Sequence, residues 1–116
     1  MKIKLAQMLP FLDEEDLSTL VEEIRNSDAG EYRGVRLCHL LPFLSEEQVS
    51  DLFLEELKEK KDVTAFYPFL PEKTYKEIVD RYLSGEQEID INALYPFLPD
   101  KELHRLFAAA MQEEEG

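Results

Sequence analysis

The chain of 116 residues has only one cysteine and no long apolar run. Cys38 cannot form an internal disulfide, which favours a reducing compartment. No stretch approaches the ~20 apolar residues that span a bilayer. The short apolar N-terminus is interrupted by Pro10 and the acidic residues 13–16, unlike a signal peptide. We therefore predict a cytoplasmic protein without a membrane segment.

Basic residues are also scarce, with 13 Lys and Arg against 26 Asp and Glu and a formal net charge of −13. The charge is spread evenly, because residues 1–58 carry −7 and residues 59–116 carry −6. Binding to nucleic acid or to an anionic membrane needs clustered basic side chains, so we predict neither. The charge suits solubility, or a protein partner with a basic surface.

Catalytic motifs are missing as well: the sequence has no glycine-rich phosphate loop, nucleophile elbow, CxxC or HExxH pattern. His39 and His104 are not at metal-ligand spacing, and the adjacent Cys38 and His39 would point in different directions on a helix. The paired acids lack an EF-hand pattern and fit solvated helix faces. We expect no enzyme activity, no cofactor and no metal.

The sequence does contain one short motif, which is repeated four times. It reads Met8-Leu9-Pro10-Phe11-Leu12, Leu40-Leu41-Pro42-Phe43-Leu44, Phe66-Tyr67-Pro68-Phe69-Leu70 and Leu94-Tyr95-Pro96-Phe97-Leu98. Around each proline, apolar residues stand five, two and one positions before it and two after it, which is helical spacing. This predicts a short proline-containing helix over about 5–12, 37–44, 63–70 and 91–98. Asp62 and Asp90 are placed to cap two of them.

A second apolar pattern follows at seven, ten, eleven and fourteen residues after each proline, and it predicts a longer helix of three to four turns. Glu56 breaks this pattern in the second repeat. Ser45 to Gln48 form a capping box, Asp13 takes the serine's place in the first repeat, and Pro71 and Pro99 take it in the others.

The proline should kink or end its helix, because it lacks an amide and clashes with the carbonyl four residues back. The phenylalanine that follows then lies at the corner of a helical hairpin. We predict that all four are wedged between helices: Phe11, Phe43, Phe69 and Phe97.

The predicted fold is all-α, a short α-solenoid of four αα-hairpin repeats with about eight helices in a single domain, residues 1–116. The repeats cover approximately 3–27, 34–60, 62–85 and 90–112, because units this small must stack to bury their apolar faces. Residues 112–116 show no apolar period and are predicted to be a frayed end.

The candidate partner-binding residues lie at two places where the repeats differ from one another. The longest connection, residues 26–36, carries Tyr32, Arg33 and Arg36, and Tyr and Arg are common binding hot spots; an ordinary long loop is the alternative. Leu54 stands where the other repeats have Glu22, Asp80 and Ala108, so it looks exposed and is a second candidate contact.

The hairpins Met8 to Val21 and Leu40 to Phe53 resemble bacterial helical-hairpin repeats of the armadillo/HEAT-like kind. Similar leucine-rich hairpins occur in the N-terminal domain of a magnesium transporter and in the flagellar motor-switch protein. The resemblance implies a helical-repeat fold. It carries over no magnesium-site or motor-contact residue.

These observations favour a non-enzymatic protein–protein interaction module or scaffold. The alternative is an acidic regulator or decoy that mimics nucleic-acid charge on a basic partner, with binding that weakens steeply in salt. An enzyme is the third and least favoured class, because it needs a pocket with perturbed titratable groups.

Overall fold

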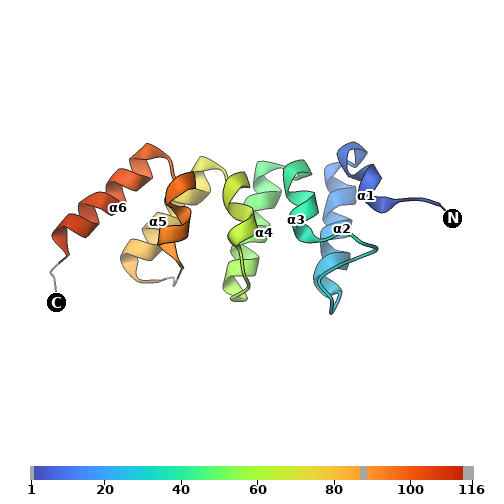
Figure 1. The fold of residues 1–116 in the computed structure, drawn as a ribbon, viewed down its shortest axis with the longest axis horizontal. Helices are drawn as coiled ribbons and strands as arrows, with labels where there is room; N and C mark the ends of the chain where they lie inside the picture. The colour runs from blue at the N-terminus through green and yellow to red at the C-terminus, as the bar shows by residue number, and fades with distance from the viewer. Residues whose placement is uncertain (1, 87–88, 114–116) are drawn as a thin grey trace. The chain divides into compact units, whose positions relative to one another are not determined.

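The computed structural model describes residues 2–86 and 89–113, and this part of the chain is helical without a strand (Figure 1). Six α-helices and four 3-10 segments follow one another. Two of the 3-10 segments directly continue a short α-helix, so the described residues form eight helical stretches. The prediction of an all-α fold with about eight helices is confirmed. The predicted frayed end covers residues 112–116: Gln112 is the last residue of α6 and Glu113 its C-cap, and residues 114–116 lie outside the described residues.

The four long helices are equal in length, each with 13 residues that begin four positions after the repeat's proline: α2 (Glu14–Asn26), α4 (Glu46–Lys58), α5 (Glu72–Ser84) and α6 (Asp100–Gln112). Side-chain caps start the first two. Asp13 Oδ1 accepts from the amide of Asp16 at 2.8 Å. Ser45 Oγ accepts from the Gln48 amide at 3.1 Å, and Gln48 Oε1 accepts from the Ser45 amide at 3.0 Å. The predicted capping box is confirmed, and it satisfies amides that a helix start leaves free.

The proline-containing helices are wound more tightly than predicted. In the first two repeats an α-helical turn becomes 3-10 at the proline, and in the last two the whole stretch is 3-10: α1 (Leu5–Met8) with η1 (Leu9–Phe11), α3 (Leu37–Leu40) with η2 (Leu41–Phe43), η3 (Thr64–Phe69) and η4 (Ile91–Phe97). Proline cannot donate the next α-helical hydrogen bond, so the chain closes with shorter turns. Each helix ends one residue after its proline, as predicted.

The predicted burial of the four phenylalanines is wrong. Phe11 is 87% exposed, and Phe43, Phe69 and Phe97 are each about 40% exposed. The phenylalanine is the last residue of the 3-10 turn and points outward beside an exposed proline. The leucine after it turns to an extended conformation and faces inward instead, as with Leu70 and Leu98.

The caps of η3 and η4 differ, although the sequence predicts the same for both. Asp62 Oδ1 accepts from the Thr64 amide at 3.0 Å and from the Thr64 hydroxyl at 2.7 Å. Asp90 stands at the N-cap of η4, but its side chain makes no capping hydrogen bond. The prediction is therefore confirmed for Asp62 and wrong for Asp90.

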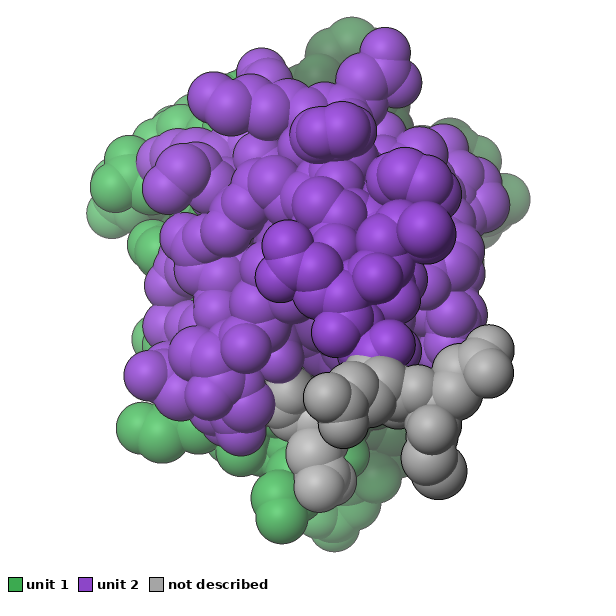
Figure 2. Space-filling model, turned by 90° about the vertical axis from the view of Figure 1, so that its left-hand side faces the viewer, with its two compact units in different colours: residues 1–69 green, residues 70–116 purple. Residues whose placement is uncertain are grey.

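The chain divides into two compact units, residues 1–69 and 70–116, which Figure 2 colours separately. The boundary lies inside the third repeat, between η3 and α5. The single domain and the solenoid arrangement of the four repeats stay predictions.

Repeats meet within unit 1 through their buried positions. One cluster joins α2 to Val35 and α3, with these buried residues: Leu9, Leu17, Leu20, Ile24, Val35 and Leu40. At the next junction the rings of Phe53 in α4 and Phe66 in η3 meet edge to face. In unit 2, Ile78 and Val79 of α5, Leu94 of η4 and Leu106 of α6 are buried.

Candidate functional site

The connection between α2 and α3 is held by a tight turn. The amides and carbonyls of Tyr32 and Val35 exchange two hydrogen bonds of 2.9 Å, and the turn between them places Arg33 and Gly34 at positive φ. Val35 is fully buried, and the half-buried Tyr32 packs against the unit 1 core. Tyr32 therefore supports the core, while Arg33 lies exposed at the tip of the turn.

Arg36 lies apart from Arg33, at the start of α3, where its amide donates to His39 Nδ1 at 3.0 Å. It lines a pocket of about 470 Å³ in unit 1 together with Arg25, Cys38 and Glu56. Tyr32, Arg33 and Leu54 are not among the lining residues. Of the four predicted contact residues, only Arg36 reaches this pocket.

Leu54 is half-buried in α4 rather than exposed. The alignment of the repeats placed it with Glu22, Asp80 and Ala108, which are all exposed. Its neighbours on α4, Phe53 and Leu57, are buried. Leu54 thus lies at the edge of a buried surface, which weakens the reason for proposing it as a contact.

The charged wall of the unit 1 pocket is a network that ties α2 to α4. Arg25 donates to Glu55 and, at 2.7 Å, to Glu59. Its Nη2 lies 3.7 Å from Glu56 Oε2, and Lys61 Nζ lies 3.2 Å from the same oxygen. Glu56, the acidic residue that breaks the apolar pattern in the sequence, is only 5% exposed. An acid at an apolar repeat position was the one signal that could have indicated this network.

The charges of this network stabilise one another. Hydrogen bonds from Lys61 and Arg25 lower the pKa of Glu59, and hydrogen bonds to Glu59 and Glu56 raise the pKa of Lys61. Burial acts to lower the pKa of Arg25, but the hydrogen bond to Glu59 and the nearby carboxylates outweigh it and raise this pKa. The charged side chains are therefore engaged with each other, and the network acts as a structural link.

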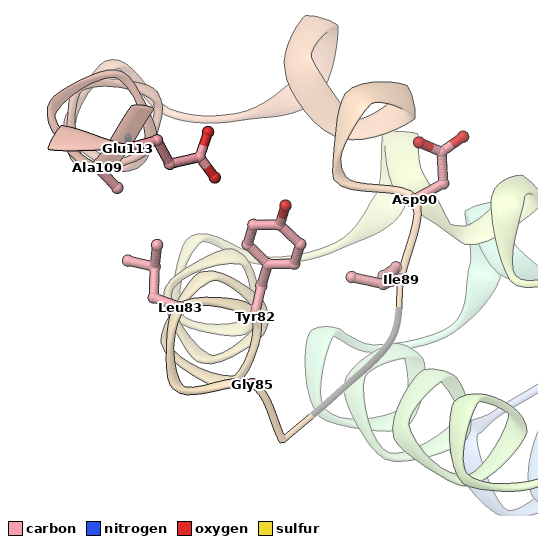
Figure 3. A pocket seen from close by; sticks show the side chains of 7 residues that line it. All are labelled: Tyr82, Leu83, Gly85, Ile89, Asp90, Ala109 and Glu113. Atoms are coloured by element: carbon pink, nitrogen blue, oxygen red, sulfur yellow. The ribbon is translucent and has the colours of Figure 1, made fainter. Parts of the chain in front are cut away.

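A second pocket, of about 740 Å³, lies in unit 2 between the ends of α5 and α6 (Figure 3). Leu83 and Ala109 form part of its apolar wall, and Tyr82 points its hydroxyl into the space. The other polar lining groups are the carboxylates of Asp90 and Glu113.

The described residues contain no group of three or more His, Cys, Asp and Glu arranged to hold a metal ion. Within residues 2–86 and 89–113, every helix is too short or too polar to cross a membrane.

The outer face of α6 carries an uncovered apolar stripe, which we name the α6 stripe: Leu103, Phe107 and Met111. These residues are 39%, 60% and 70% exposed. A spacing of four places them on one side of the helix. Sequence reasoning missed this surface because the first two fit the same repeat pattern as buried residues elsewhere.

The other repeats bury most residues at the positions of Leu103 and Phe107, where only Val21 is half-buried. The position of Met111 differs, because its equivalent in the third repeat, Leu83, is 42% exposed. Seven residues after the proline, Leu17, Val49 and Tyr75 are each at most 5% exposed, compared with 39% for Leu103. Eleven residues after it, Phe53 and Val79 are fully buried, compared with 60% exposure for Phe107. The α6 stripe is therefore a repeat-junction surface without its neighbour, and it is the candidate functional site.

Comparison with models of known protein families, with curated proteins and with solved structures finds no match to this chain.

Proposed function

We propose that the protein is a protein–protein interaction module and that the α6 stripe is its contact surface. The observation that carries the proposal is the exposure of Leu103 and Phe107 at repeat positions that are buried or half-buried in the preceding repeats, with exposed Met111 beside them. Contiguous exposed apolar side chains on a helix commonly mark interaction surfaces. A cytoplasmic location, as the single cysteine indicates, accords with this role.

The chemistry of the stripe indicates a helical partner. Within unit 1, the helix that covers the equivalent face of α4 is η3, which inserts Phe66 against Phe53. A partner of the α6 stripe would present a short helix with one large apolar side chain in the same way. Burying Phe107 fully would contribute about 1.5–3 kcal/mol, enough for it to act as a binding hot spot.

The acidic-decoy alternative gains less support from the structure. Six of the acids are engaged by Arg or Lys side chains of the same chain: Glu55, Glu56, Glu59, Glu77, Asp80 and Glu102. Other acids, such as Glu14, Glu46, Glu72 and Asp100, stand in the first turns of the long helices, where they favour helix formation. This hypothesis remains a prediction.

The proposal is tested with a photo-crosslinking amino acid at position 107 in the native cell, with the same probe at exposed His104 as the control. A partner identified at 107 is then purified and titrated with the wild-type chain and with Leu103→Asp. We expect about thirtyfold weaker binding for the variant. Equal crosslinking at both positions, or equal affinities, would refute the contact surface.

A further inference from the structure

The first and fourth repeats each expose an apolar residue at a repeat position that is buried at the internal junctions of the series. At each internal junction, the residue two positions before a proline is buried: Leu40, Phe66 and Leu94, each at most 4% exposed. Met8 has the same position in the first repeat and is 41% exposed. Among the described residues, no long helix covers Met8 as α2 covers Leu40 and α4 covers Phe66, and no proline-containing helix covers Phe107.

The internal junctions show what these two halves bind. In the second junction, Phe66 of η3 meets Phe53 of α4 with ring centroids 5.9 Å apart. In the first, Leu40 of α3 lies in the same buried cluster as Leu17 and Leu20 of α2. At both of these junctions, the residue two positions before the proline therefore packs on the long helix of the preceding repeat. By position, Met8 corresponds to Phe66, and Phe107 corresponds to Phe53.

We propose that the α6 stripe binds the first repeat of a second copy of this chain, so that copies associate head to tail. Met8 of one copy would pack on Phe107 of the next, and a methionine sulfur against an aromatic ring is a favourable contact. This inference rests on the proposed function of the α6 stripe and names its partner.

Charge at the edge of the interface agrees with this pairing. At the second junction, Glu59 lies 17 residues after its proline and pairs at 3.0 Å with Lys61, two residues further along the same connection. Glu113 has the same position in the fourth repeat, and Lys2 and Lys4 flank the position of Lys61 in the first. The head-to-tail contact would therefore place an acid opposite two bases.

The α6 stripe and the surface around Met8 are different, so a pair of associated copies still has one free α6 stripe and one free Met8 surface. Such heterologous contacts extend a chain of copies unless the rotation between copies closes a ring. A dimer formed by two α6 stripes would instead be symmetric and would stop at two copies. This difference makes the proposal testable with single substitutions.

The test is analytical ultracentrifugation of the full-length chain from about 1 to 500 µM. We expect the wild type to form species larger than a dimer as the concentration rises. Phe107→Asp and Met8→Asp should each remain monomeric. Mixed together, they should form a 1:1 heterodimer and nothing larger, because the mixture retains one intact interface.

Two matched controls carry the same charge change away from the interface. Phe11→Asp alters an exposed residue whose position is exposed in all four repeats. Ala108→Asp alters an exposed residue next to Phe107, at a position where the first and third repeats carry Glu22 and Asp80. Both variants should associate like the wild type.

A wild type that stays monomeric at every concentration would overturn the proposal. So would a Met8→Asp variant that still dimerises while Phe107→Asp does not, since that result indicates a symmetric contact of α6 stripes. A monomeric chain that still binds an identified partner through position 107 would leave the proposed function standing and refute only the head-to-tail contact.

Discussion

The rings of Phe53 and Phe66 meet edge to face, with an interplanar angle of 65°, and join the second repeat to the third. Phe53 is fully buried at this contact. Aromatic pairs in this geometry stabilise a fold beyond the area they bury. The same repeat position holds Phe107 in α6, where it is mostly exposed. This pair of phenylalanines allows the contribution of a covered junction to be measured against an uncovered one.

Phe53→Ala should lower the free energy of unfolding by about 3–5 kcal/mol, because it leaves a cavity in the junction. Phe107→Ala should change it by less than about 0.5 kcal/mol. Urea unfolding followed by circular dichroism, at a concentration where the chain is monomeric, measures both. Equal losses would contradict the assignment of Phe107 to an uncovered surface.

Arg25→Met should destabilise the fold by about 1–3 kcal/mol, because buried Glu56 loses an opposing charge and keeps only Lys61. Adding Glu56→Leu to this variant should recover most of the loss, since the buried carboxylate is then removed as well. A double-mutant cycle by urea unfolding gives the coupling. Additive effects would show that Arg25 and Glu56 act independently.

Asp62→Ala should lower the melting temperature, because it removes both hydrogen bonds that start η3. Asp90→Ala, at the same repeat position, should lower it clearly less, because Asp90 makes no capping hydrogen bond. Thermal unfolding of the two variants under identical conditions makes the comparison. A larger loss for Asp90→Ala would contradict the difference between the caps.

Acidification should destabilise the chain through carboxylates whose pKa is lowered in the fold. Hydrogen bonding to Arg105 lowers the pKa of Asp80, and hydrogen bonding to Lys61 and Arg25 lowers that of Glu59. The unfolded chain then binds protons more readily than the folded one. This contribution is present above the ordinary Asp and Glu pKa values and is lost as the pH falls through the lower folded values.

The urea midpoint should therefore decline as the pH is lowered below about 4.5. Asp80→Asn should be less stable than the wild type at pH 7, and the difference should shrink in acid. Urea titrations at a series of pH values measure this. A difference between the two proteins that stays constant down to pH ~3 would contradict the role of Asp80.

The helices were predictable from the sequence because their signals are local. Periodic apolar residues, the Ser45 to Gln48 capping box and the prolines depend on neighbours within a few positions. The exposure of a repeat position is different, because it depends on whether another helix lies against it. Phe53 and Phe107 share a position and differ only in this respect, so the candidate site could not be recognised from the pattern.

The errors have the same origin. The phenylalanines after the prolines were predicted to be buried because they are large and apolar. At the corner of the hairpin, however, the leucine that follows is the side chain that faces the core. Glu56 looked like an interruption because one of its partners, Arg25, comes from the helix of the preceding repeat. Such pairings are settled by tertiary packing and leave little trace in a local pattern.

The division of the chain between Phe69 and Leu70 is out of phase with the repetition of its sequence. A fragment cut at the end of the second repeat, near residue 60, would lose Phe66 and leave the ring of Phe53 open to water. A fragment extended to residue 69 retains that cover. The first compact unit of this protein therefore consists of two repeats plus the first helix of a third, rather than a whole number of repeats.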